Sequence, residues 1–91
     1  MRPLTTFTES FLLVVRYYAA VDKSLALRFI EAVDQAHNEI VRFPAIGRLT
    51  GKYRASRVKG FPHTFCYVES LDGEMVALVL FHHKQSDPRI E

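Results

Sequence analysis

The spacing of apolar positions predicts two consecutive helices in the first half of the chain. Over residues 9–20, apolar side chains recur every three or four positions, as they do on one face of a helix: Phe11, Val14, Val15, Tyr18 and Ala19. After a break at residues 22–24, a longer stripe runs to the end of the second helix: Ala26, Phe29, Ile30, Val33, Ala36, Ile40 and Phe43. Pro44 ends that helix, because the residue before a proline is pushed out of the helical conformation. Since the connection is only about three residues long, the two helices are expected to form an antiparallel hairpin.

The remaining segments have the composition of strands. Residues 3–8 favour a short edge strand, with Thr8 placed to cap the first helix. The later strand candidates are residues 53–60, 63–70 and 74–83. The run from Met75 to Phe81 is apolar at every position, which is typical of a central strand. We therefore expect an α+β fold: an N-terminal strand, then an antiparallel two-helix hairpin packed on one face of a small, mostly antiparallel sheet, with three strands after the hairpin.

The turn between the last two strands determines their expected register. Asp72-Gly73 is a favoured pair for a tight hairpin turn. A two-residue loop sets three pairs opposite each other: Tyr67 and Leu78, Phe65 and Leu80, and His63 and His82. The two histidines then have Cβ atoms about 4.5–5.5 Å apart. A bulged three-residue loop would instead shift the register by one residue and separate them.

Length and composition indicate one small globular domain. The 91 residues, 48% of them apolar, suffice for a single hydrophobic core, and no linker or repeat divides them, so one domain is expected over residues 1–91. The longest apolar run is far shorter than the roughly 20 residues that a membrane-spanning helix needs, and the N-terminus lacks a secretory pattern. Cys66 is the single cysteine, so no internal disulfide can form. A cytoplasmic location without membrane contact is expected.

Positive charge is concentrated in one segment, although the net charge is only +2. Residues 48–59 contain no acid and five cations: Arg48, Lys52, Arg54, Arg57 and Lys59. Alternation along a strand places Arg57 and Lys59 on one face and Arg54 on the other, so a single patch requires the loop around Lys52 to curl over the sheet. Two interpretations stay open: solvated cations that discourage edge pairing, or a basic groove for phosphates or an acidic peptide, with Arg54 and Arg57 as bidentate partners. The small net charge argues against broad coating of nucleic acid, so nucleic-acid contact is secondary.

Two histidines are the candidates for acid–base chemistry. Because imidazole titrates near neutral pH, His63 and His82 can act as a general acid/base pair on a phosphodiester held by Arg57 or Arg54. The alternative is that both histidines are structural. His82 and His83 are adjacent in a strand and point to opposite faces, so they cannot share one ion, and no metal site is expected. No nucleotide-binding motif occurs, and no cofactor is expected.

Three segments resemble toxins of the RelE/ParE superfamily from bacterial type II toxin–antitoxin modules. They are IVRFPAIGR at a helix end, VKGFPHTFCYV, which is similar to the family's Phe-Pro-Tyr-x-Ile-x-Tyr strand, and FHHKQSDP, which is similar to its closing His-x-Arg-Arg-x-Pro. The resemblance extends over nearly the whole chain. It implies the architecture described above and a small cognate antitoxin that folds an acidic tail around the toxin. The expected antitoxin- or target-binding residues are basic: Arg48, Lys52, Arg54, Arg57, Lys59 and Lys84.

The two branches of this superfamily imply different activities. RelE-like members cut mRNA at the ribosome without a metal, using sheet cations, an arginine on the last strand and a C-terminal tyrosine. Lys52, Arg54 and Arg57 lie where the sheet cations would be, but the last strand ends in histidines and residues 86–91 contain no tyrosine. ParE-like members inhibit DNA gyrase by protein contact, and the two long helices look closer to them. We therefore expect a ParE-like gyrase inhibitor that is not an enzyme; the alternatives are a metal-independent mRNA endoribonuclease and a non-toxic member that retains antitoxin binding.

Overall fold

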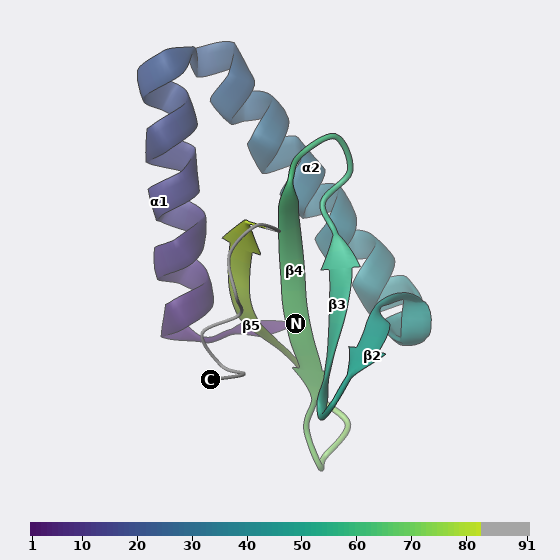
Figure 1. Cartoon of the computed structure of the whole chain (residues 1–91). Helices are drawn as coiled ribbons and strands as arrows, with labels where there is room; N and C mark the ends of the chain where they lie inside the picture. Colours follow the sequence, from purple (N-terminus) through teal and green to yellow (C-terminus); the bar gives the residue numbers. More distant parts are fainter. Residues whose placement is uncertain (83–91) are drawn as a thin grey trace.

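The chain forms two layers, a five-stranded sheet and a pair of helices that covers one of its faces (Figure 1). A computed structural model describes residues 1–82. The elements in chain order are β1 (Arg2–Pro3), α1 (Thr5–Val21), α2 (Lys23–Arg42), the short 3-10 helix η1 (Pro44–Ile46), β2 (Arg48–Thr50), β3 (Tyr53–Arg57), β4 (His63–Glu69) and β5 (Met75–His82). This is the expected α+β architecture, with four strands rather than three after the helical hairpin.

A single residue, Asp22, connects the two antiparallel helices (Figure 1). Its extended backbone ends α1, and its carboxylate caps α2 by accepting hydrogen bonds from the Ser24 N–H (2.9 Å) and the Ser24 hydroxyl (3.0 Å). These hydrogen bonds, led by the one from the backbone, hold the pKa of Asp22 below its usual range, because they stabilise the charged form. At the other end α2 stops at Arg42, two residues before Pro44, as the sequence predicts.

The main core lies between α2 and the sheet. Five predicted positions of the α2 stripe are buried: Ala26, Phe29, Val33, Ala36 and Ile40. All of them except Ala26 belong to one cluster with sheet-side residues that include Val58, Phe65, Tyr67, Ala77 and Leu80. Helix α1 has no buried residue, but its predicted face still touches this core through Phe11, Val14, Val15 and Tyr18. Two positions assigned to the α2 stripe face solvent instead, since Ile30 is 37% and Phe43 59% exposed, and Ala19 of α1 is exposed as well.

The sheet has the strand order β1-β5-β4-β3-β2. Strand β1 is parallel to β5, and every other neighbouring pair is antiparallel. The apolar strand β5 is less central than its composition suggests, because β1 pairs with it only at Val76 and Ala77. Strand β4 occupies the middle of the sheet. Strand β2, which the sequence did not predict, is the short edge strand on the other side.

The β4–β5 register combines a longer loop with a β-bulge. Glu69 pairs with Met75, and the Ser70 N–H donates to the Glu74 carbonyl (2.8 Å), so the loop has three residues, not two. Its last residue, Gly73, has a φ of 85°, which suits glycine. Tyr67 therefore faces Ala77 instead of the predicted Leu78, and a register shift between Cys66 and Tyr67 then leaves Leu78 as the extra residue of β5.

Beyond that bulge the predicted register is restored. Phe65 faces Leu80 and His63 faces His82, as expected from the sequence. The one-residue shift introduced by the loop is cancelled by the one-residue shift at the bulge. The histidine pairing is thus confirmed, although the loop that was assumed for it is wrong.

The N-terminal segment differs from its prediction. The strand expected over residues 3–8 is reduced to Arg2 and Pro3, and α1 begins at Thr5 with Leu4, not Thr8, as its N-cap. Two hydroxyls of α1 bond the edge of β5 in place of a longer strand: Thr6 donates to the Leu78 carbonyl (2.6 Å), and Ser10 accepts from the Leu80 N–H (3.0 Å). Helix α1 therefore protects a sheet edge that would otherwise have unpaired backbone groups.

Candidate functional site

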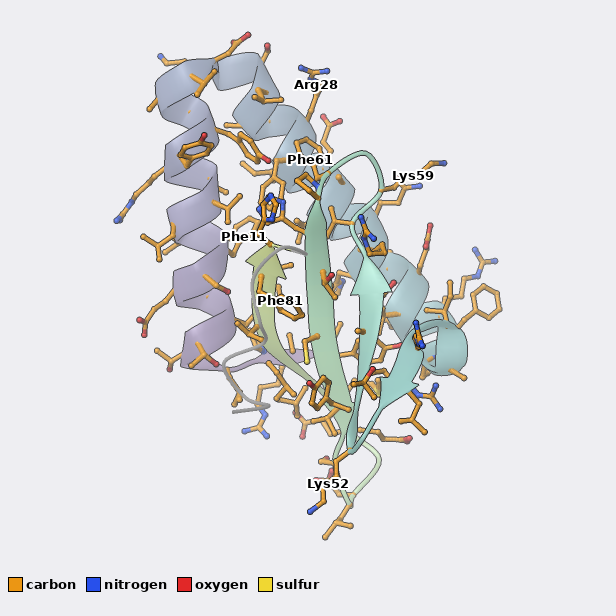
Figure 2. The ribbon with its side chains drawn as sticks, viewed as in Figure 1. Phe11, Arg28, Lys52, Lys59, Phe61 and Phe81 are labelled. Atoms are coloured by element: carbon orange, nitrogen blue, oxygen red, sulfur yellow. The ribbon has the colours of Figure 1, made fainter. Side chains whose placement is uncertain are left out.

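The five cations of residues 48–59 are spread over strands β2 and β3 and the adjoining loops, at one edge of the sheet. Arg48 lies on β2 and Arg57 at the end of β3, and both are exposed. Lys52 and Lys59 lie in the loops before and after β3, at opposite ends of that strand (Figure 2). The structure therefore does not bring the five charges into one patch. The sixth predicted binding residue, Lys84, lies outside the described residues, as does His83.

Arg54 and Arg57 point to opposite faces of the sheet, as alternation predicts. Arg54 pairs across the strands with Tyr67, which belongs to the core on the helix side. Arg57 pairs with Thr64. The side chain of Thr64 points to the opposite face from those of its neighbours His63 and Phe65, and Phe65 belongs to the core. Arg57 thus belongs to the face that α1 and α2 leave uncovered, whereas Arg54 points toward the end of α2.

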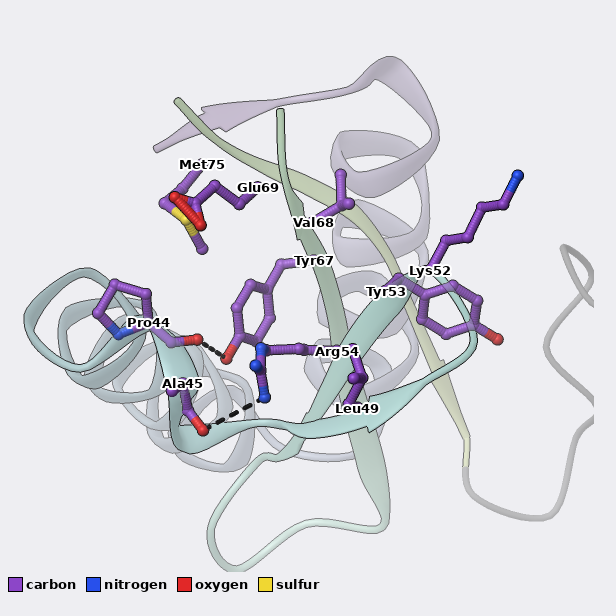
Figure 3. A pocket seen from close by; sticks show the side chains of 10 residues that line it. All are labelled: Pro44, Ala45, Leu49, Lys52, Tyr53, Arg54, Tyr67, Val68, Glu69 and Met75. Carbon is purple, nitrogen blue, oxygen red and sulfur yellow. Dashed lines mark hydrogen bonds between the residues drawn. The ribbon is translucent and has the colours of Figure 1, made fainter. Parts of the chain in front are cut away.

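Arg54 and Tyr67 together hold the turn that links α2 to β2 (Figure 3). One terminal nitrogen of Arg54 donates to the Gly47 carbonyl (2.9 Å) and more weakly to the Ala45 carbonyl (3.5 Å). The buried Tyr67 hydroxyl donates to the Pro44 carbonyl (2.7 Å) and accepts from the Gly47 N–H (2.9 Å). These contacts hold residues 44–47, which lie within the resemblance motif IVRFPAIGR. The turn borders a cavity of about 220 Å³.

The two histidines of the acid–base hypothesis are neighbours in the structure. The ring centroids of His63 and His82 are 5.4 Å apart, and the two residues line a cavity of about 580 Å³ between α1 and β5. His63 is only 5% exposed, and its ring also contacts Phe29 (5.2 Å) and Tyr18 (6.0 Å). Burial, followed by the charge of the neighbouring Tyr17, raises the pKa of the Tyr18 hydroxyl.

No arginine of the predicted set stands beside this histidine pair. Arg57 lies on the opposite face of the sheet from His63, because the facing residues alternate along β4. Arg54 is on the same face but faces Tyr67, which is four residues from His63 and so about 13 Å away along the strand. The arrangement in which Arg54 or Arg57 holds a phosphodiester between His63 and His82 is therefore not formed by these residues.

An apolar flank of α1 was missed by the sequence analysis. Leu13, Tyr17 and Val21 recur every four residues and are 65%, 68% and 66% exposed, respectively. Leu13 and Tyr17 also line the large cavity next to His63 and His82. A signal for this flank was present, because α1 carries apolar residues beyond the single stripe that packing on the sheet requires.

Residues 1–82 contain neither a cluster of metal ligands nor a membrane-spanning helix. No group of three or more His, Cys, Asp or Glu residues in this range is arranged to hold a metal ion. No helix in the described part of the chain is long and apolar enough to cross a membrane.

Comparison with known proteins identifies the fold. No protein-family profile matches the sequence, and no curated protein matches it. Among solved structures, the chain is similar to one from a structure described as "Chromosomal ParDE TA system from P. aeruginosa", with a TM-score of 0.76 and 9% sequence identity. The match covers 89% of this chain and 91% of the other. The chain thus has the fold seen in that ParDE structure, as the resemblance of its sequence motifs implies.

Proposed function

We propose that this protein is the toxin of a type II toxin–antitoxin system, that a cognate antitoxin neutralises it in the cytoplasm, and that it inhibits DNA gyrase by protein contact. The observation that carries the proposal is the match of nearly the whole fold to a chain of a ParDE system, at a TM-score of 0.76. The motif resemblance to ParE-like toxins supports it independently, because it rests on sequence motifs and not on the fold.

An antitoxin is the partner that best fits the surface. The exposed flank of Leu13, Tyr17 and Val21 borders a cavity of about 580 Å³, and such an apolar surface is suited to the apolar side of a partner segment. The cations on the β2–β3 side supply the charge that would attract an acidic antitoxin tail. The residues proposed to contact it remain Arg48, Lys52, Arg54, Arg57, Lys59 and Lys84.

The geometry favours action by protein contact over RNA cleavage. An acid–base mechanism needs a cation that holds the phosphate beside the proton-transfer groups, and neither Arg54 nor Arg57 stands next to His63 and His82. One observation does favour the endoribonuclease alternative, namely that the two histidines share a cavity. That alternative makes both histidines essential, whereas the proposed function does not.

A growth assay in a bacterial host tests the proposal. Induction of the chain should arrest growth, and co-expression of its antitoxin, expected to be a small acidic protein encoded next to it, should restore growth. The matched variant H63Q/H82Q should arrest growth equally, because both replacements keep a polar side chain of similar size without an acid–base group. Loss of arrest in this variant, with the fold retained by circular dichroism, would favour the nuclease. Absence of arrest by the wild-type chain would indicate the non-toxic alternative.

A further inference from the structure

The cavity beside the α2–β2 turn is lined by Lys52 and Arg54, which are among the residues proposed to contact the antitoxin, but the proposed function does not use the cavity itself. It has a volume of about 220 Å³, smaller than the roughly 300–1,000 Å³ of sites for drug-sized ligands. Tyr67 and Met75 supply apolar surface, and Pro44 and Ala45 line the side next to α2 (Figure 3). A space of this size suits a molecule with only a few non-hydrogen atoms.

Arg54 lines this cavity, and one of its two terminal nitrogens is already hydrogen-bonded to the protein backbone. The carbonyls of Gly47 and Ala45 bind one terminal nitrogen and so fix the direction of the guanidinium. A guanidinium has five N–H groups, so Nε and the other terminal nitrogen keep a pair of parallel donors, the arrangement that matches a carboxylate. Because two backbone carbonyls hold the side chain in place, a ligand would bind a preorganised fork.

The guanidinium of Arg54 has no carboxylate partner among residues 1–82. The ion pair that these residues form joins Arg2 to Glu74, at 3.2 Å, and no carboxylate of the described part lies within 4.0 Å of Arg54. Arg54 is nevertheless half-buried, and a cation withdrawn from water gains from a bound anion. The site therefore offers both the geometry and the charge for an anionic group.

Glu69 gives the same cavity an acidic end. It lies two residues after Tyr67 on β4 and so shares the face on which Arg54 lies, diagonally across the strand pair. Figure 3 shows Arg54 and Glu69 on either side of the Tyr67 ring. Lys52 also lines the cavity, but Figure 3 shows its side chain extending away from the Tyr67 ring. The carboxylate of Glu69 disfavours a multiply charged anion such as phosphate. It favours a ligand that carries an ammonium group as well as a carboxylate.

We propose that this cavity binds a small zwitterion of amino-acid size, with its carboxylate on Arg54 and its ammonium group at Glu69. The Tyr67 ring and Met75 contact the aliphatic part of the ligand. This site is separate from the cavity lined by His63 and His82, and the proposal does not depend on the toxin function.

Titrations of the full chain with matched probes test the proposal. The probes are alanine, propionate, which lacks the amine, ethylamine, which lacks the carboxylate, and inorganic phosphate. Binding is followed by NMR through the Arg54 Nε–H and the Gly47 N–H. We expect saturable shifts with alanine, and affinities at least about tenfold weaker for the other three probes, because each lacks one of the two charge contacts or adds a repulsive one. Shifts that are absent, or equal for alanine and propionate, would overturn the proposal.

Two variants separate the roles of the charges. R54K keeps the positive charge but loses the planar fork, so alanine should bind about tenfold more weakly. E69Q changes an exposed side chain and should leave the fold intact, yet it should remove most of the preference for alanine over propionate. The control E39Q, on the solvent side of α2, should behave as the wild type. A preference for alanine that survives in E69Q would contradict the assignment of Glu69.

Discussion

The hydroxyl of Tyr67 lies 2.9 Å from the nitrogen of Gly47, and a Cβ atom at position 47 would come within 2.6 Å of that same oxygen. The backbone of Gly47 is extended, with φ of −72° and ψ of 146°, so any residue could adopt it. The requirement for glycine is therefore steric. It arises from a tyrosine that lies 20 positions later in the sequence and holds the turn after α2 in place.

Substitutions at these two positions should be coupled. Y67F should lower the free energy of unfolding by about 1–3 kcal/mol, because the Gly47 N–H and the Pro44 carbonyl each lose a buried partner. G47A should cost about 1–3 kcal/mol through overpacking against the hydroxyl and the edge of the Tyr67 ring. In the double variant the contact with the oxygen is gone while that with the ring carbon Cε1, at 2.8 Å, remains, so the combined loss should fall short of the sum by roughly 0.5 kcal/mol. Chemical denaturation of the wild type, the two single variants and the double variant measures the coupling. Strictly additive losses would show that the contact between positions 47 and 67 does not affect stability.

The helix–sheet core predicts a sharp contrast between two adjacent residues of α2. Ile40 is fully buried, whereas Val41 is 49% exposed. I40D should abolish cooperative unfolding, since an unpaired charge in the core costs more than about 4 kcal/mol, much of a small domain's stability. V41D, one position along the same helix, should change the free energy of unfolding by less than about 1 kcal/mol. Thermal melts followed by circular dichroism decide this, and a cooperative melt for I40D would mean that the stripe does not face the sheet.

The capping carboxylate between the helices predicts a pH dependence. The pKa of Asp22 is lowered in the folded protein, so its contribution to stability is present above the unfolded-state pKa and is lost as the pH falls through the folded-state value. D22A should therefore melt at a lower temperature than the wild type near neutral pH, and the gap should narrow as the pH falls to about 3. D22N retains an acceptor for the Ser24 N–H at every pH, so its advantage over D22A should persist in acid. A gap between wild type and D22A that is constant with pH would exclude this role of the charge.

The basic side of the sheet should contribute to antitoxin binding through its charge. R57A removes an exposed cation that projects from the uncovered face of the sheet, and it should weaken antitoxin binding about three- to tenfold and reduce its dependence on salt. R28A removes an exposed arginine from α2, outside both the basic and the apolar residues proposed to contact the antitoxin, and serves as the matched control, with affinity near that of the wild type. Calorimetric titration at two salt concentrations provides both values. If R57A binds as tightly as R28A at low salt, the cations of the β2–β3 side do not attract the antitoxin and only keep that edge solvated.

The elements with a long periodic signal were predictable from the sequence. The α2 stripe is strongly periodic, and Phe29, Val33 and Ile40 are buried as expected. Strand β2 was not predicted, because its three residues are too few to show any alternation. The strand expected over residues 3–8 became helical for a tertiary reason: the hydroxyls of Thr6 and Ser10 find acceptor and donor groups on the edge of β5, which local propensity does not describe.

The candidate site was predictable in part. Local alternation was enough to place Arg54 and Arg57 on opposite faces, and the expected pairing of His63 with His82 is confirmed. The predicted pairing is correct although the loop has three residues and not the assumed two, because the bulge at Leu78 compensates for the extra loop residue. The attachment of Arg54 to the carbonyls of residues 45 and 47 could not be foreseen, because it depends on how the end of α2 lies against β3. Which residues contact a partner stays a prediction.

The most direct test of the account is a supercoiling assay with purified DNA gyrase, run beside an mRNA-cleavage assay with ribosomes, on the same preparation of this chain. The account predicts that the chain inhibits supercoiling, that a stoichiometric amount of antitoxin restores it, and that H63Q/H82Q inhibits as strongly as the wild type, with no cleavage of mRNA. Cleavage of mRNA that disappears in H63Q/H82Q, together with unimpaired supercoiling, would contradict it.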